Sequence, residues 1–310
     1  MTAHYSRTPL NQGECLTLKN QKYLIRDNIG FGGSCLVYYA EHEPNENERE
    51  IGMPTVPAIV KEFYPLELSA DITRNPNGEL TVQAAVREVF DSLKRRFESG
   101  AAEQTAFCVS DGNHSLPLPV LDFQNGTAYT AVALTNGQTL LDCAESLSMF
   151  EKSDVITSLC NAVKKLHDNG KLYLDLKPSN IFIFEKAQNE SRRVALFDFD
   201  TVITATNTDS AFISYSEGWS PYEQKNQRRE EISYTADIYS IGAVYYWMLK
   251  GEKVSDTVLN EIIRGRFDFL DEIKELQSNK RLKETIGQFL SATLKRLPEK
   301  RAQRVEDIPL

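Results

Sequence analysis

The sequence lacks several features that mark specialised classes of protein. No apolar run in its 310 residues approaches the roughly 18 needed to span a bilayer, so we expect no membrane segment in this chain. The N-terminal stretch has no apolar core of a secretory signal peptide. The five cysteines are odd in number and include no CxxC pair. This disfavours a disulfide framework or a zinc site and favours reduced thiols in a cytoplasmic protein.

The chain is also poor in positive charge. Its formal net charge of −9 at pH 7 argues against nucleic acid as a partner. We interpret the short basic cluster at 94–96 as a solvated helix face. At 41% hydrophobic and 25% charged residues, the composition is that of an ordinary globular protein. The length suits one large domain or two lobes sharing a cleft.

The N-terminal part has the pattern of a β-rich region. Residues 82–107 carry apolar side chains at helical spacing, and the polar, proline-interrupted stretch 42–57 predicts a loop. Asn125-Gly126 predicts a tight turn between two strands. Five segments rich in β-branched and aromatic residues predict strands: 23–29, 36–41, 58–64, 117–123 and 127–134.

Beyond residue 139 the pattern becomes mostly helical. Ser153-Asp154 predicts the cap of a helix over 155–167, closed by Asn169-Gly170. A β-rich patch follows at 172–203, and then a long apolar helix over 237–249. The change from β-rich to helix-rich sequence lies near residues 135–139.

A glycine-rich turn lies between the first two predicted strands. Gly30, Gly32 and Gly33 would let backbone N–H groups approach phosphate oxygens without a Cβ clash. A strand follows the turn, which disfavours a Rossmann or Walker-type site because both use a helix N-terminus. Taken alone, the turn is weak evidence and favours a tight hairpin with no ligand. Likewise Lys61, 31 residues after Gly30, could be an ordinary exposed strand lysine.

The segment YLDLKPSN at 173–180 is the most specific motif. Phosphoryl transfer needs a carboxylate that orients the attacking hydroxyl, a cation over the developing charge and oxygen ligands for Mg²⁺. Asp175, Lys177 and Asn180 supply one of each from a single loop. Asp198, between two phenylalanines, is an acid for which a metal ion is a natural partner. Each group alone could be a turn residue, but their order and spacing together argue against that reading.

These motifs resemble those of the eukaryotic-like Ser/Thr protein kinases, in the form common in bacteria, over about residues 23–305. The matching segments are GFGGSCLV, AIVKEFYP, YLDLKPSN, DFD and GWSPYEQ. The resemblance implies an α+β, bilobal kinase fold as a single domain over 1–310. Its N-lobe (about 1–134) would hold five antiparallel strands and one helix, and a hinge at 133–138 would lead to a mostly helical C-lobe (139–310). The implied reaction is Mg²⁺-dependent transfer of the γ-phosphate of ATP to Ser or Thr of a protein substrate, with Mn²⁺ as an alternative ion.

The resemblance also implies residue roles in the C-terminal part. Asp175 would orient the substrate hydroxyl, and Lys177 would neutralise the γ-phosphate. Asn180 and Asp198 would bind the metal. Ser216 would hydrogen-bond the catalytic aspartate and lysine, which favours Ser/Thr over Tyr substrates. Two structural anchors are implied as well. One is the ion pair of Glu223 with Arg301, and the other is Asp237 of the long helix.

In the N-terminal part, the resemblance implies a nucleotide site. Lys61 would hold the α- and β-phosphates and pair with a helix glutamate, with Glu103 as first choice and Glu98 as second. The remaining nucleotide-binding residues implied are Gly30, Gly32, Gly33, Val37, Ile59, Val132, Ala133 and Leu134.

The sequence departs from the family pattern beside the catalytic aspartate. Tyr173 replaces a histidine, and we expect its ring to pack on Phe199. Leu174 replaces the arginine that normally pairs with a phosphorylated activation loop, so the chain is of the non-RD type. We therefore expect activity without phosphorylation of that loop.

Three further departures support alternative functions. Cys35 replaces a loop glycine, Ile59 replaces a small residue above the adenine, and Asp200 replaces the glycine of D-F-G. They support a pseudokinase that binds nucleotide or acts as a scaffold. A small-molecule kinase is a further alternative, disfavoured by Lys177 and by the Pro-x-Glu segment at 221–223.

Overall fold

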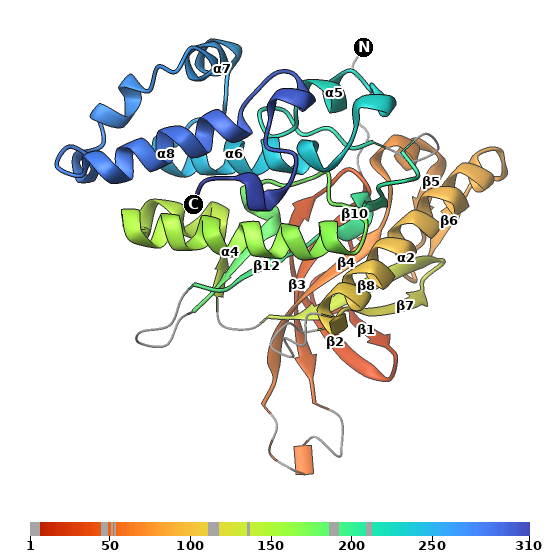
Figure 1. Ribbon diagram of the computed structural model, residues 1–310. Helices are drawn as coiled ribbons and strands as arrows, with labels where there is room; N and C mark the ends of the chain where they lie inside the picture. The colour runs from red at the N-terminus through yellow and green to blue at the C-terminus, as the bar shows by residue number, and fades with distance from the viewer. Residues whose placement is uncertain are drawn as a thin grey trace. The chain divides into compact units, whose positions relative to one another are not determined.

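The computed structural model describes residues 7–44, 49–50, 52, 54–110, 118–134, 137–185, 192–208 and 213–310. The chain divides into two compact units, residues 1–135 and 136–310, which we describe separately (Figure 1). That the two units together form one kinase domain stays a prediction. Within the described ranges, no helix is long and apolar enough to cross a membrane.

Unit 1 is built on an antiparallel sheet in the order β1-β2-β3-β4-β8-β7. Its strands are β1 (Cys15–Leu18), β2 (Gln21–Phe31), β3 (Cys35–Glu43), β4 (Val56–Phe63), β7 (Val120–Gln124) and β8 (Thr127–Ala133). The two edge strands also meet, because the Lys19 amide donates to Asp122 at 2.5 Å and the Thr17 amide to Gln124 at 3.1 Å. The sheet therefore curls towards a barrel.

One helix packs on the core side of this sheet. Helix α2 (Arg87–Ser110) contributes Phe90 and Phe97, whose rings lie 5.2 Å and 5.6 Å from the ring of Phe63 on β4. All three side chains are almost fully buried. The core of unit 1 thus lies between α2 and one face of the sheet.

An insertion between β4 and α2 was not predicted. It comprises the 3₁₀ turn η1 (Leu66–Asp71), the hairpin β5 (Ile72–Arg74) and β6 (Leu80–Val82), and η2 (Ala84–Val86). The predicted helix start at residue 82 was wrong, because Val82 pairs with Ile72 in this hairpin. The prediction of five strands was also wrong, because the described part of unit 1 holds this hairpin beside a six-stranded sheet. Three-residue strands are too short to give a periodic signal.

Short strands of unit 2 frame two loops. β9 (Gly137–Thr139), β11 (Ile181–Phe184) and β12 (Val194–Leu196) form one small sheet, and β10 (Lys171–Leu172) pairs with β13 (Ile203–Thr204). The β-rich patch predicted over 172–203 is confirmed. Residues 173–180 connect β10 to β11, and residues 197–202 connect β12 to β13.

The rest of unit 2 is mostly helical. Its α-helices are α3 (Leu140–Cys143), α4 (Met149–Asp168), α5 (Tyr222–Lys225), α6 (Tyr234–Lys250), α7 (Asp256–Ile263) and α8 (Lys280–Thr293). Its 3₁₀ turns are η3 (Ala144–Ser146), η4 (Pro178–Asn180), η5 (Phe199–Thr201), η6 (Arg229–Glu231), η7 (Asp268–Asp271), η8 (Lys274–Leu276), η9 (Pro298–Lys300) and η10 (Val305–Asp307).

Helix α6 is the centre of this unit and is buried on most of its sides, as its continuous apolar sequence predicted. α4 and α8 both pack against it. Gly242 allows the contact with α8, because a Cβ there would lie 2.3 Å from Oγ1 of Thr293. A side chain at this position would force the two helices apart.

Helix α4 begins earlier than predicted. Its cap is Ser148, whose hydroxyl accepts the amide of Glu151 while the Glu151 carboxylate accepts the amide of Ser148. The predicted cap at residues 153–154 was therefore wrong, and Asp154 instead accepts the amide of Arg192 at 2.6 Å. The predicted end at Asn169-Gly170 is confirmed, with Gly170 at φ 69°.

Candidate active site

The carboxylate of Asp175 is held by three neighbours in unit 2. Ser216 Oγ donates to Oδ1 at 2.6 Å, Lys177 Nζ donates to Oδ2 at 2.7 Å, and Asn180 Nδ2 donates to Oδ2 at 3.0 Å. Lys177 Nζ also lies 3.5 Å from Ser216 Oγ. Asp175 itself is 6% exposed. The structure thus brings these predicted residues together, and the predicted hydrogen bond from Ser216 is confirmed.

The backbone before Asp175 is held by helix α6. The carboxylate of Asp237 accepts the amides of Tyr173 at 2.9 Å and of Leu174 at 2.8 Å. Leu174 has φ 64°, a left-handed conformation that costs a non-glycine residue about 1–2 kcal/mol. The two charge-assisted hydrogen bonds offset that cost and fix the direction in which the next residue points. The predicted anchoring by Asp237 is confirmed.

Asn180 ties the two loops of unit 2 to each other. Its amide nitrogen donates to the backbone oxygen of Asp175 at 3.0 Å, and its backbone oxygen accepts the amide of Phe197 at 3.0 Å. Phe197 immediately precedes Asp198, which also has a left-handed conformation with φ 66°. The position of Asp198 is therefore coupled to that of residues 173–180 through one shared asparagine.

Tyr173 links the same two loops from within the core. Its ring packs edge-on against Phe199 with centroids 5.6 Å apart, as predicted, and its hydroxyl donates to the backbone oxygen of Phe197. Burial, with the nearby carboxylates of Asp198 and Asp175, raises the pKa of Tyr173 well above its ordinary value. The residue therefore remains a neutral donor. Sequence reasoning identified the ring contact but missed the hydroxyl.

The oxygen atoms of Asn180 and Asp198 suit a divalent cation. Asn180 uses its amide nitrogen for Asp175, so its side-chain oxygen is left to accept, with only a 3.4 Å contact from Ser179. Mg²⁺ prefers oxygen ligands and is commonly bound by one or two carboxylates together with substrate phosphates. Among the described residues, no group of three or more His, Cys, Asp or Glu side chains could hold a metal on its own. Asn180 and Asp198 therefore offer oxygen donors of the kind that a divalent cation accepts.

In unit 1, the predicted nucleotide residues lie across neighbouring strands. Gly30 pairs with Val37, and Val37 pairs with Lys61. Two residues before Lys61, Ile59 pairs with Val132. All five residues are half-buried, and the side chains of the other four share the face on which Gly30 lies. Alternate residues on these strands, which are Tyr38, Val60 and Ala131, point into the core and are at most 1% exposed.

The glycines of the turn have no packing reason to be glycine. A Cβ on Gly33 would meet nothing within 4 Å, and one on Gly32 would come no closer than 3.4 Å to Cys35. Gly30, Gly32 and Gly33 are also absent from the residues with positive φ. Without a Cβ at these positions, the backbone of the turn is open to close approach by a ligand.

The remaining predicted residues of unit 1 are Ala133, Leu134, Glu103 and Glu98, and the described contacts do not join them to one another. Ala133 pairs with Ala58, and the amide of Leu134 donates to Pro57 at 2.7 Å. Glu103 and Glu98 both lie half-buried on α2. Which of the two glutamates meets Lys61 stays a prediction.

Sequence reasoning missed a buried charge beside Lys61. Glu62 is completely buried and accepts from Arg74 at 2.6 Å, Tyr38 at 2.7 Å and Tyr129 at 2.5 Å. The available signal for this buried charge was the glutamate within the apolar strand AIVKEF. Side chains alternate along a strand, so Glu62 points to the face opposite that of Lys61. The partner Arg74 comes from the unpredicted hairpin.

A second buried ion pair was predicted correctly. Arg301 donates to both carboxylate oxygens of Glu223 at 2.5 Å and 3.0 Å, and neither side chain is exposed. Arg301 also donates to the backbone oxygen of Thr235 at 3.1 Å. This bidentate pair ties the segment at 219–225 to helix α6.

Comparison with known proteins defines the family. A model of the protein kinase domain matches residues 123–308, more than half of the chain. Serine/threonine-protein kinase PknB of Mycobacterium leprae is 24% identical over 242 residues, which cover 75% of this chain and 33% of the relative. Ribosomal protein S6 kinase 2 alpha of Gallus gallus is 30% identical over 224 residues, which cover 67% of this chain and 29% of the relative. The chain spans about a third of the length of these relatives.

A solved structure shows the same fold. The crystal structure of a double mutant of the PknI kinase domain from Mycobacterium tuberculosis matches with a TM-score of 0.59 at 16% identity, covering 97% of this chain and 96% of that one. The chain therefore belongs to the protein kinase domain family, in its eukaryotic-like Ser/Thr branch. The predicted family and the α+β kinase fold are both confirmed.

Proposed function

We propose that this chain transfers the γ-phosphate of ATP to Ser or Thr hydroxyls of a protein substrate. The observation that carries this proposal is the set of contacts around Asp175, which would orient a hydroxyl and accept its proton. Lys177 lies beside it as a cation for the transferred phosphoryl group. Asn180 and Asp198 would hold Mg²⁺, or Mn²⁺ in its place, which when bound offsets phosphate charge. The free state of all five cysteines supports a cytoplasmic location.

The alternative of a pseudokinase is not favoured. It rested on the substitutions Cys35, Ile59 and Asp200, none of which disturbs the described contacts of Asp175. A scaffold would have no need for a buried carboxylate that is bound by both a lysine and an asparagine.

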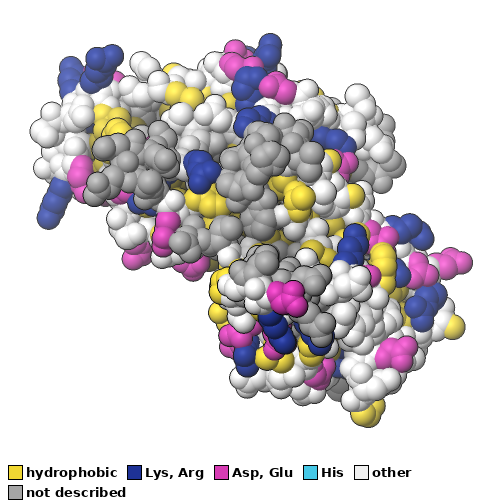
Figure 2. Space-filling view, turned by 90° about the horizontal axis from the view of Figure 1, so that it is seen from below, with side chains coloured by type: hydrophobic (Ala, Val, Ile, Leu, Met, Phe, Trp, Pro, Cys, Tyr) yellow, Lys and Arg dark blue, Asp and Glu magenta, His cyan; other side chains and the backbone are white. Residues whose placement is uncertain are grey.

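On the face drawn in Figure 2, basic and acidic side chains are interspersed among the coloured residues, and neither sign forms a continuous patch there.

We also propose that activity does not require phosphorylation of the activation segment. Where the family has an arginine for a phosphate group, Leu174 is buried in an apolar cluster with Ile213 of that segment and with Ile232. Apolar packing would then do what an arginine–phosphate pair does elsewhere. Treatment with a phosphatase should leave the activity intact, and loss of activity on dephosphorylation would contradict this proposal.

The central test is incubation with Mg²⁺, γ-labelled ATP and a generic protein substrate such as casein. Asp175→Asn should lower turnover by about 10²–10⁴-fold while leaving ATP binding largely intact. Asp268→Asn, an exposed aspartate of the same unit, is the matched control and should retain full activity. Equal labelling by the wild type and Asp175→Asn would refute the assignment, and ATP binding without any labelling would favour the pseudokinase.

A further inference from the structure

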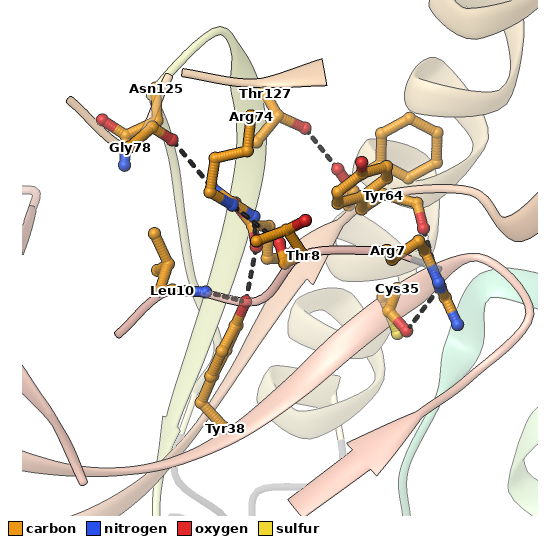
Figure 3. Close-up of polar contacts among 12 residues, drawn as sticks. Arg7, Thr8, Leu10, Cys35, Tyr38, Tyr64, Arg74, Gly78, Asn125 and Thr127 are labelled. Carbon is orange, nitrogen blue, oxygen red and sulfur yellow. Dashed lines mark hydrogen bonds and ion pairs between the residues drawn. The ribbon is translucent and has the colours of Figure 1, made fainter. Parts of the chain in front are cut away.

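Residues 7–10 are held firmly on unit 1 without being part of a strand or helix. The guanidinium of Arg7 forms the first attachment (Figure 3). The backbone oxygen of Thr8 accepts Nε of Arg74 at 2.7 Å, and the amide of Leu10 donates to the hydroxyl of Tyr38 at 3.0 Å. Arg74 and Tyr38 are two of the three partners of buried Glu62. We call residues 7–10 the N-terminal strap.

Arg7 connects the strap to both ends of the glycine-rich turn. Its Nη2 donates to the backbone oxygen of Gly32 at 2.6 Å, and its Nη1 donates to that of Cys35 at 3.1 Å. Nη1 also donates to the backbone oxygen of Tyr64 at 2.7 Å, three residues beyond Lys61. A single planar guanidinium therefore fixes the turn relative to the end of the lysine-bearing strand.

The carbonyl oxygens between these two ends are bound as well. The amide of Leu66 donates to Gly33 at 2.8 Å, and the amide of Tyr64 donates to Ser34 at 3.0 Å. Four successive carbonyl oxygens, from residue 32 to residue 35, thus accept hydrogen bonds from within unit 1. Because a carbonyl oxygen repels phosphate and an N–H attracts it, this arrangement removes the groups that would oppose an anion.

The charge of Arg7 adds to this effect. The side chain is buried, with 5% exposure, and among the described residues no carboxylate pairs with it. Burial lowers the pKa of Arg7, although an arginine stays protonated in proteins. The described partners of this buried cation are three carbonyl oxygens and the Phe31 ring, whose centroid lies 6.0 Å away, so a positive potential remains at the turn. An anion on the outer side of the turn would be stabilised by that potential.

We propose that Arg7 is a positioning residue for nucleotide binding, which shapes the glycine-rich turn and makes its surroundings positive for the phosphates of ATP. The inference rests on the proposed function, because it takes ATP as the ligand. Arg7 itself would not touch the nucleotide. It would act through the backbone of residues 32–35, on which it has two of its three hydrogen bonds.

The test compares Arg7→Met and Arg7→Lys with a matched control, Arg26→Met. Arg26 lies in the same unit, and its ion pair with Glu41 is on the surface. Arg7→Met should weaken ATP-Mg²⁺ binding by calorimetry and raise the KM for ATP, each about tenfold, with the KM for the protein substrate unchanged. Arg7→Lys should show a smaller loss, about threefold, because it keeps the charge but not the fork of donors. Hydrogen exchange of the amides at 32–36 should be faster in both Arg7 variants.

Several outcomes would overturn the proposal. A folded Arg7→Met that binds ATP within about twofold of the wild type removes the positioning role. An equal loss of ATP affinity in Arg26→Met would show a general effect of removing a positive charge from unit 1. If Arg7→Met does not fold, Arg7→Lys decides: unchanged ATP affinity together with unchanged exchange at 32–36 refutes the role. A wild type that fails to label substrate but binds ATP with the predicted dependence on Arg7 refutes the proposed kinase activity alone.

Discussion

Each unit contains a carboxylate that is almost inaccessible to solvent, and the two differ in their partners. Glu62 in unit 1 is completely buried, and its cation Arg74 is 4% exposed at the side chain. Asp175 in unit 2 is 6% exposed, and its cation Lys177 is 28% exposed at the side chain. Glu62 is bound by an arginine and two tyrosines that are all buried, whereas Asp175 is bound by a lysine that is partly exposed, a serine and an amide. We infer that the first carboxylate stabilises the fold, and the proposed function requires the second to accept a substrate hydroxyl.

The tyrosines of unit 1 reinforce this difference. Burial, followed by the charge of Glu62, raises the pKa of both Tyr38 and Tyr129 far above the ordinary value. Both hydroxyls therefore stay protonated, as donors to Glu62, well above the pH at which an ordinary tyrosine titrates. Asp175 accepts instead from a lysine, a serine and an amide, and the lysine side chain is partly exposed.

The largest effect should come from removing the cation of the structural carboxylate. Arg74→Met leaves Glu62 buried with only hydroxyl partners, and we expect a loss of about 3–5 kcal/mol in the free energy of unfolding. Denaturant titration followed by circular dichroism measures it. Arg26→Met, which breaks an exposed pair, should have little effect. Similar stabilities of the two variants would show that the buried charge of Glu62 is tolerated without its arginine.

A smaller effect, on rate and not on stability, should follow from loss of one partner of Asp175. Ser216→Ala removes the 2.6 Å hydrogen bond to Oδ1, and we expect kcat to fall about tenfold with an unchanged melting temperature. Ser216→Thr should retain most of the activity. Ser214→Ala on the same segment is the control for a general effect of the substitution. A drop in melting temperature without a drop in kcat would assign Ser216 a structural role.

The smallest effect concerns acid stability at the start of helix α4. Arg192, then the amide of Ser148, lowers the pKa of Glu151 to about 2 from 4.5. The stabilisation is therefore present above pH 4.5 and is lost as the pH falls towards 2. Since the pair is partly solvated, we expect at most about 1 kcal/mol. Glu151→Gln should flatten the dependence of unfolding on pH over this window, whereas exposed Glu145→Gln should not.

Contacts were predictable where one motif holds the residues or where the family resemblance implies the pair, as for Glu223 and Arg301. Asp175, Lys177 and Asn180 interact within one loop, so a single motif predicted their contact. The role of Arg7 depends on Tyr64, which lies 57 residues away, and no local pattern reports such a contact. The hairpin carrying Arg74 was missed because its strands have three residues each. The cap of α4 was predictable, since Ser148 and Glu151 have the spacing of a capping box. The prediction placed the cap at Ser153-Asp154 instead.

The N-terminal strap also bears on how fragments of this protein should be cut. The motif resemblance begins near residue 23, and a fragment starting there would carry every recognised kinase motif. It would lack Arg7, the backbone oxygen that binds Arg74, and the first strand of the sheet. If Arg7 positions the glycine-rich turn as proposed, such a fragment should bind ATP more weakly than the full chain, although all its kinase motifs are intact. The useful boundary for expression therefore lies before residue 7.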